Sequence, residues 1–134
     1  MALFKFTKAI LSNKPITVFN NGNMIRDFTY VDDIVSGVMN CLSSPPKGEN
    51  GRVPYAVYNL GNSRSEKLMD VISIIEGELG RRAEINFKPI QPGDVTETYA
   101  DITDATADFG FKPIVNIADG LPKFIRWYRE FYTA

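Results

Sequence analysis

Residues 20–35, NNGNMIRDFTYVDDIV, carry the most informative pattern in the chain. They open with Asn and Gly, continue with an arginine followed by aromatic and β-branched residues, and end where Asp32 and Asp33 start an apolar period. Asn and Gly favour turns, β-branched and aromatic residues favour strands, and acidic side chains stabilise helix N-termini. The stretch therefore predicts a turn, a strand over 28–31 and a helix that begins at Asp32.

The residues before this stretch predict a helix and a short strand. Leu3, Phe6 and Ile10 recur at helical spacing, and Pro15 follows as a stop. Residues 16–19, ITVF, are rich in β-branched side chains and lead into the turn. A helix followed by a strand is thus expected to open the chain.

Residues 43–54, SSPPKGENGRVP, separate this beginning from the rest. Three prolines and two glycines without an apolar period predict a flexible loop over about residues 43–55. Residues 56–60 then have the apolar character of a strand buried on both faces.

The second half predicts three helices and one strand. Ser63 and Glu66 have capping-box spacing, and residues 68–79 have a strong helical period that ends before a glycine. Residues 85–87 alternate like a half-buried strand, Asp101 is placed to cap a short helix up to residue 109, and residues 117–128 form a final amphipathic helix. Few short strands among about five helices indicate an α/β fold.

Composition excludes several classes of function. At 134 residues the chain suits one domain, and its net charge of −1 gives no general attraction for nucleic acid or anionic membranes. Without histidine and with one cysteine, it has no histidine-based triad and no zinc cluster, and no metal is expected. No apolar run could span a bilayer and no signal peptide opens the chain, so we expect a soluble, cytoplasmic protein.

Several segments resemble one known family in the same order. Beside residues 20–35 these are residues 1–20 (MALFKFTKAILSNKPITVFN), 58–63 (YNLGNS), 91–113 (QPGDVTETYADITDATADFGFKP) and 117–132 (IADGLPKFIRWYREFY). They resemble extended short-chain dehydrogenase/reductase enzymes that act on nucleotide sugars. QPGDV together with RDFTYVDD is most similar to the UDP-glucuronate (or galacturonate) 4-epimerase branch.

The resemblance implies a part of a larger, homodimeric enzyme. Residues 1–134 would be its C-terminal UDP-sugar-binding domain and would lack most of the Rossmann-type sheet that binds the dinucleotide. The chain has no GxxGxxG turn, and no tyrosine is followed four residues later by lysine, the pair on which this family relies for proton transfer. NAD and the catalytic residues would therefore belong to a missing N-terminal domain, and the chain alone would be inactive.

The resemblance also implies substrate-binding roles for six residues. Arg26 would bind the diphosphate, because a guanidinium forks onto phosphate oxygens. Asp94 would accept hydrogen bonds from the ribose hydroxyls. The uracil would be bordered by Thr17, Phe19 and Phe28. Gln91 stands where many relatives have arginine, so it would make a weaker contact with the diphosphate.

Each assignment has a structural alternative. Arg26 could be a solvated surface charge, Asp94 an ordinary turn residue, and Phe19 and Phe28 members of the core. The whole chain could instead belong to a related sugar-nucleotide dehydratase or decarboxylase, act as a stand-alone non-catalytic UDP-binding module, or be a truncated product without a function of its own.

Overall fold

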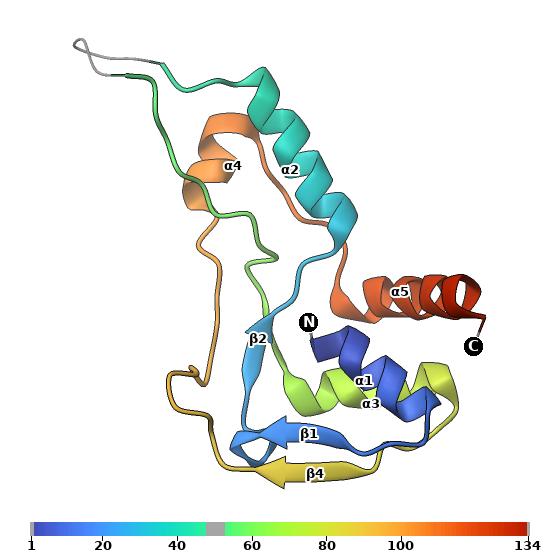
Figure 1. Cartoon of the computed structure of the whole chain (residues 1–134). Coiled ribbons are helices and arrows are strands. Elements are labelled where there is room, and N and C mark those ends of the chain that lie inside the picture. The colour runs from blue at the N-terminus through green and yellow to red at the C-terminus, as the bar shows by residue number, and fades with distance from the viewer. Residues whose placement is uncertain (1, 48–52, 134) are drawn as a thin grey trace.

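A computed structural model describes residues 2–47 and 53–133 and divides them into two units (Figure 1). We call the first the core unit; it combines three helices with a parallel pair of strands. Its elements are α1 (Ala2–Leu11), β1 (Ile16–Phe19), α3 (Leu68–Leu79), β4 (Ile85–Lys88) and α5 (Ile117–Tyr132). The second unit, the arm, comprises α2 (Val31–Ser43), α4 (Thr103–Phe109) and residues 53–62.

The core unit is built on β1 and β4. The two strands run parallel, with Ile16 opposite Ile85 and Phe19 opposite Lys88. Ile16 and Val18 are buried while Thr17 and Phe19 are partly exposed, so β1 alternates as a half-buried strand should. Buried apolar side chains of α1, α3 and α5 complete one hydrophobic core over this strand. The expected helix and strand at the start of the chain are confirmed.

A short antiparallel pair continues from the core unit toward the arm. β2 (Ile25–Asp27) pairs with β3 (Ser65–Lys67), so that Arg26 lies opposite Glu66. Two predictions are wrong here. No strand forms over residues 28–31: the strand lies three residues earlier, where Ile25–Asp27 pair with β3, and α2 begins at Val31. The expected capping box is absent, because Glu66 belongs to β3 and α3 begins only at Leu68 without a side-chain cap.

The strand expected over residues 56–60 is also wrong. Residues 53–57 are exposed, with Val57 at 71%, and 53–60 have no strand partner among the described residues. A doubly buried strand needs neighbours on both edges and cover on both faces. The part of the chain seen here supplies neither, so the segment runs extended along the outside of the arm.

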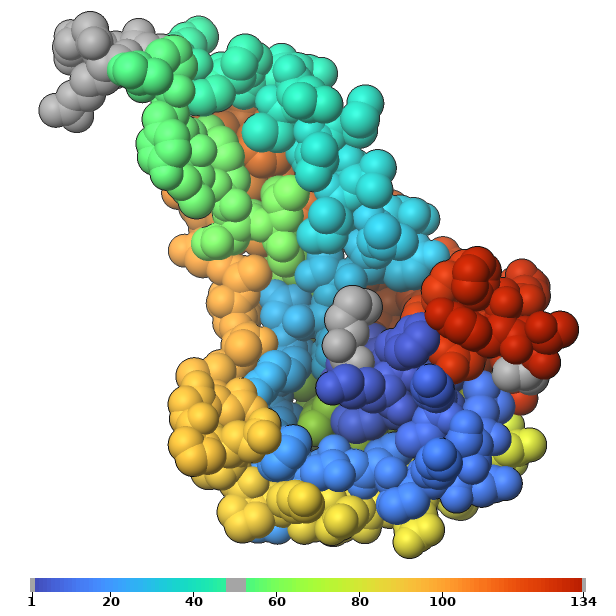
Figure 2. All heavy atoms as spheres, in the orientation of Figure 1, coloured from blue at the N-terminus to red at the C-terminus, as the bar shows by residue number. Residues whose placement is uncertain are grey.

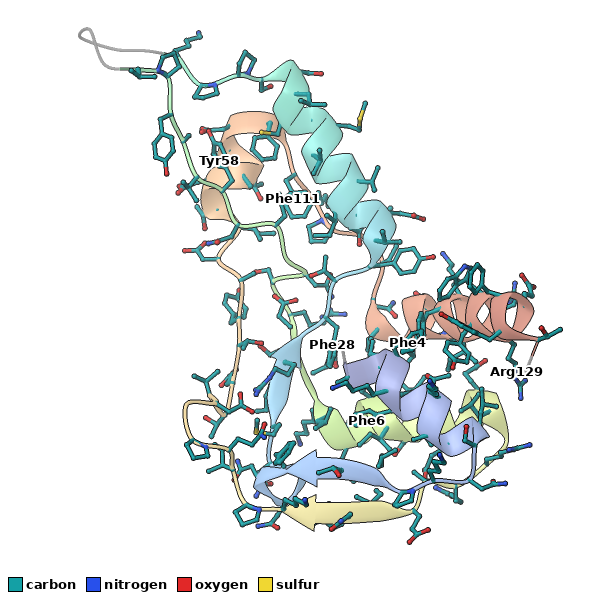
Figure 3. The ribbon with its side chains drawn as sticks, viewed as in Figure 1. Phe4, Phe6, Phe28, Tyr58, Phe111 and Arg129 are labelled. Atoms are coloured by element: carbon teal, nitrogen blue, oxygen red, sulfur yellow. The ribbon has the colours of Figure 1, made fainter. Side chains whose placement is uncertain are left out.

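The arm is held together by a small cluster under α2. The helix turns Asp33 and Gly37 inward, and a Cβ at Gly37 would lie 2.8 Å from the Phe111 ring. Phe111, labelled in Figure 3, packs in one cluster with Ala105 and Phe109 of the α4 region. The apolar side chains that gave α2 its sequence period point outward instead, since Val38 and Leu42 are 48% and 72% exposed. Most of the apolar period of α2 therefore lies on its exposed side.

The expected ends of α3 and α4 agree with the structure, whereas the cap expected from Asp101 is wrong, because Ile102 stands at the N-cap of α4 and no side-chain cap hydrogen bond is made there. α3 and α4 end at Gly80 and Gly110 in left-handed backbone conformations, and the Asn116 side chain caps α5. The five α-helices and few short strands of residues 2–47 and 53–133 make the chain α/β. The centre of the loop expected at 43–55, residues 48–52, lies outside the described residues. No helix of the described residues has the length and apolar character to cross a membrane.

Candidate functional site

A pocket of about 630 Å³ opens between α1, β1, β2 and the turn at residues 91–94. Figure 2 views this side of the molecule, with the loop around residues 91–97 on one side and α1 on the other. Its wall contains five of the six residues proposed from the sequence: Thr17, Phe19, Arg26, Phe28 and Asp94. Residues far apart in the sequence thus meet around one cavity.

The sixth residue, Gln91, does not line this pocket. It starts the turn that carries Asp94, because the Asp94 amide donates to the Gln91 carbonyl at 3.1 Å. Pro92 and then Gly93, at φ +82°, are the residues that a type II turn requires at its two central positions. Gln91 therefore contributes a backbone carbonyl that shapes the turn.

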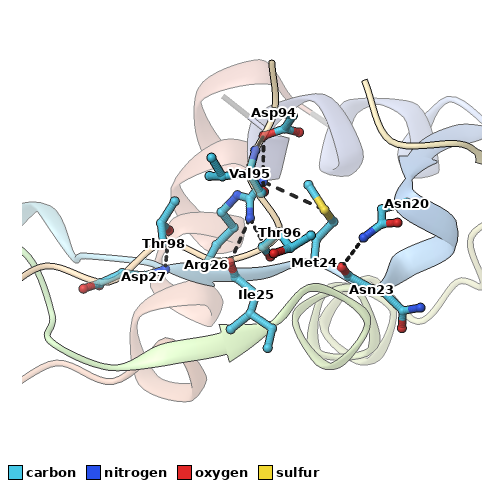
Figure 4. Close-up of polar contacts among 10 residues, drawn as sticks. All are labelled: Asn20, Asn23, Met24, Ile25, Arg26, Asp27, Asp94, Val95, Thr96 and Thr98. Carbon is cyan, nitrogen blue, oxygen red and sulfur yellow. Dashed lines mark hydrogen bonds and ion pairs between the residues drawn. The ribbon is translucent and has the colours of Figure 1, made fainter. Parts of the chain in front are cut away.

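Arg26 lies at the centre of the polar contacts of this pocket (Figure 4). Its Nη2 donates to Asp94 Oδ1 at 2.9 Å and to the Val95 carbonyl at 2.6 Å. Its Nη1 donates to the carbonyls of Ile25 at 2.8 Å and Thr96 at 3.1 Å. The Arg26 side chain is 21% exposed and that of Asp94 33%, so the ion pair joins two partly solvated groups at the pocket wall.

Asp94 accepts hydrogen bonds both from its own turn and from Arg26. Its Oδ1 accepts from the Val95 amide at 2.8 Å as well as from Arg26. Arg26 and Asp94 are 68 residues apart, yet the structure brings them into direct contact. The sequence indicated both residues but not that they would bind each other.

Two further residues of the wall escaped the sequence analysis. Lys5, on α1, adds an exposed cation to the same pocket as Arg26. Asp27, the neighbour of Arg26, accepts hydrogen bonds from the backbone amides of Asn62, Ser63 and Ala100 at 2.9, 3.0 and 3.1 Å. A carboxylate that accepts three amides fixes β2 against two loops, and this holds Arg26 at the pocket. Nothing in the local sequence distinguishes such an aspartate from a solvated one.

Asp32 and Asp33 differ in a way that their position at a helix start did not reveal. Asp32 is exposed, whereas Asp33 is 4% exposed and accepts from the backbone amides of Ile114 and Val115 at 3.1 and 3.0 Å. Asp33 thereby ties α2 to the segment before α5. Its role is structural, as expected, but it acts through these tertiary hydrogen bonds.

Tyr58 and Asp101 lie in and beside the arm, outside this pocket, and both have a shifted pKa. The Tyr58 hydroxyl donates to Asp108 Oδ2 at 2.5 Å, and this hydrogen bond to a carboxylate raises the pKa of Tyr58 to about 12. The hydroxyl and amide of Thr103 both donate to Asp101 Oδ1, which lowers the pKa of Asp101. Both pairs help to hold the short α4 region in place.

The pocket offers cationic and aromatic side chains to an anionic ligand with a flat ring, and the strands beside it do not have the connection that is typical of a dinucleotide site. In dinucleotide-binding folds a parallel strand leads through a glycine-rich turn into a helix whose N-terminus receives the pyrophosphate. Here β1 leads into a short 3₁₀ turn (Asn20–Gly22), and β4 leads into the exposed loop that carries Asp94. Among the described residues there is also no group of three or more acidic or cysteine side chains that could hold a metal ion.

Comparison with known proteins identifies the family. Residues 1–61 match the model of the NAD dependent epimerase/dehydratase family, and these residues include Thr17, Phe19, Arg26 and Phe28 of the pocket wall. The chain belongs to this epimerase/dehydratase family. The resemblance on which the sequence analysis relied is therefore confirmed.

Three similar proteins show how the chain compares with known sequences and structures. Protein CapI of Staphylococcus aureus is 46% identical over 98% of this chain and 43% of its own length. UDP-glucuronate 4-epimerase 1 of Arabidopsis thaliana is 40% identical over 98% of this chain and 33% of its own length. The UDP-glucuronic acid 4-epimerase of Bacillus cereus, solved in complex with UDP-glucuronic acid and NAD, is 32% identical, with a TM-score of 0.79 over 96% of this chain and 40% of its own. The chain thus spans less than half the length of these relatives.

Proposed function

We propose that this chain is the UDP-sugar-binding part of an NAD-dependent 4-epimerase that acts on a UDP-hexuronate. Two of the similar proteins carry the name UDP-glucuronate or UDP-glucuronic acid 4-epimerase, and one was solved with UDP-glucuronic acid and NAD. Because the chain spans only part of their length, its own contribution is argued from its pocket.

The observation that carries the proposal is the junction of Arg26 and Asp94 at one wall of the pocket. A guanidinium can bind a diphosphate through two parallel hydrogen bonds, and a carboxylate can accept from both hydroxyls of a ribose. Diphosphate and ribose are adjacent in UDP, as these two side chains are adjacent here. Thr17, Phe19 and Phe28 offer a partly apolar surface of the kind that receives a uracil ring.

The remainder of the enzyme would supply NAD and the groups that transfer the proton and hydride. The described residues do not fit a dinucleotide, whereas the arm exposes apolar side chains that suit burial, among them Val35 (54%), Met39 (58%) and Val57 (71%). This exposure supports the view that a further domain covers the arm. The chain would then hold the UDP end firmly while the sugar is free to turn, so that remote binding energy positions the reacting carbon.

The test is calorimetric titration of the 134-residue chain with UDP, UDP-glucuronate and NAD. We expect UDP and UDP-glucuronate to bind and NAD to give no response. Arg26→Ala should weaken UDP binding by about 2 kcal/mol, roughly thirtyfold, because a charge-assisted contact to phosphate is lost.

Arg82→Ala is the matched control. Arg82 also forms an ion pair, with Glu76 at 2.8 Å, but it is 89% exposed and does not line the pocket. Its loss should leave UDP binding unchanged. Equal effects of the two substitutions, or a folded chain that does not bind UDP, would contradict the proposed function.

A further inference from the structure

Arg26 is held by protein acceptors at both of its terminal nitrogens. Nη1 donates to two backbone carbonyls, and Nη2 donates to the Val95 carbonyl and to Asp94. A guanidinium has only two N–H groups on each of these nitrogens. A phosphate group can therefore bind Nη1 and Nη2 together only by displacing a partner that is already there, and Nε–H alone can receive it without a displacement.

Asp94 is the partner most easily displaced. The Ile25 and Thr96 carbonyls are fixed by the pairing of β2 with residues 96–98, in which the Ile25 amide donates to Thr96 at 2.9 Å and the Thr98 amide donates to Ile25 at 3.1 Å. Residues 91–94, by contrast, form an exposed turn whose one backbone hydrogen bond is internal. The turn can swing on residue 95 without breaking the strand pairing.

On the basis of the proposed function, we propose that Asp94 occupies the phosphate position on Arg26 and makes the site selective for ribose-bearing diphosphates. A phosphate that displaces Asp94 leaves a carboxylate without its cation, which is unfavourable. A nucleoside diphosphate offsets that loss, because its ribose hydroxyls donate to the freed carboxylate. Inorganic pyrophosphate has no such hydroxyls. It must therefore displace Asp94 from Arg26 without offering the freed carboxylate a new hydrogen-bond donor.

The experiment compares pyrophosphate with UDP as calorimetric probes of the 134-residue chain. In Asp94→Asn the competing charge is gone, so pyrophosphate affinity should rise by roughly threefold, the scale of a partly exposed ion pair. UDP affinity should fall by roughly tenfold, because a neutral amide replaces the ionised acceptor of the ribose. Affinities that change in opposite directions for the two probes would indicate that phosphate displaces Asp94 from Arg26.

Two further variants separate this effect from a change in net charge. Asp104→Asn removes the same charge from an exposed residue of α4 in the arm, and it should change neither affinity. In the double variant Arg26→Ala, Asp94→Asn, the gain for pyrophosphate should disappear, because it acts through Arg26.

Pyrophosphate affinity that falls, stays unchanged or stays undetected in Asp94→Asn overturns the proposal. A fall would mean that Asp94 orients Arg26 toward phosphate and does not compete with it. Failure of the unsubstituted chain to bind UDP would instead contradict the proposed function. The pyrophosphate comparison reports on Arg26 and Asp94 alone, so the two failures are distinguishable.

Discussion

The core unit and the arm bury their apolar residues to very different degrees. The core unit has twelve buried side chains in one cluster drawn from α1, β1, α3, α5 and Met24. The arm has three, Ala105, Phe109 and Phe111, although α2 also carries large apolar side chains, among them Val38 and Leu42. An apolar sequence therefore shows that a helix can be buried, and the surrounding chain decides whether it is.

The two units also rely on different interactions. Side chains of the core unit interdigitate, whereas the arm depends on individual polar contacts such as Asp33 with the amides before α5 and Tyr58 with Asp108. The pocket lies mainly on the core unit, and an exposed turn carries Asp94 at its wall. We expect substitutions in the two units to differ both in how much they change stability and in how far along the chain the change extends.

The largest effect is expected from Ile75→Ala. Ile75 is fully buried in α3, so truncation should lower the free energy of unfolding by about 3 kcal/mol through lost burial and a cavity. Ile114→Ala removes the same atoms from a side chain that is 77% exposed and should change stability by less than about 0.5 kcal/mol. Denaturant unfolding followed by circular dichroism measures both. Similar losses would show that the core unit is not the main source of stability.

Asp33→Asn should destabilise the arm by about 2 kcal/mol, because a buried carboxylate that accepts from two backbone amides is replaced by a neutral amide. Its exposed neighbour gives a matched control, since Asp32→Asn removes the same charge without these contacts. Hydrogen exchange should accelerate in α2 and not in α3 for the first variant alone. Uniform acceleration across both helices would mean that the arm and the core unit unfold together.

Two glycines allow the same substitution to be compared in both units. A Cβ at Gly61 would lie 2.2 Å from that of Ala100, so Gly61→Ala should lower stability by about 1.5 kcal/mol through overpacking. A Cβ at Gly77, inside α3, meets no atom within 4 Å, and Gly77→Ala should raise stability by about 0.5 kcal/mol. Thermal melting should shift in opposite directions. A stabilising Gly61→Ala would refute the close approach of the two loops.

The smallest effect is expected from pH in the alkaline range. The pKa of Tyr58 is raised from 10.0 to about 12 by its hydrogen bond to Asp108, so the folded arm retains a proton that the unfolded chain loses earlier. This contribution is fully present below pH 10 and is lost as the pH rises toward 12. Ultraviolet difference titration against Tyr58→Phe should show one phenol ionising near pH 12. A phenol that ionises near its ordinary pKa would show that the pair with Asp108 does not form.

Most of the core unit could be predicted from the sequence, and most of the arm could not. α1, β1, α3, β4 and α5 follow from local apolar periods and from helix ends at glycine, and these signals need no knowledge of the partners. The strand expected at 56–60 and the exposure of α2 depend on which parts of the chain cover them, and a local period does not contain that information. Apolar residues there indicated burial that the described chain does not provide.

The site could be predicted in part for the same reason. Arg26 and Asp94 belong to short motifs, and the resemblance to one family indicated them together. Their direct ion pair, the three amides on Asp27 and the presence of Lys5 on the same wall arise from contacts between distant segments. Contacts between such distant segments can be recognised only once the fold is known.

The parallel pairing of β1 with β4 determines the order in which the chain can fold. Residues 20–84, including the whole arm helix α2, lie between the two strands. The chain must therefore lose the entropy of closing this long loop before the pairing of the strands can stabilise it. A nascent chain that has emerged only as far as α3 lacks both β4 and α5, and the buried side of β1 has no neighbouring strand until residue 88 is made. Assembly of the core unit therefore waits for β4 and α5, although α1 and β1 come much earlier in the chain.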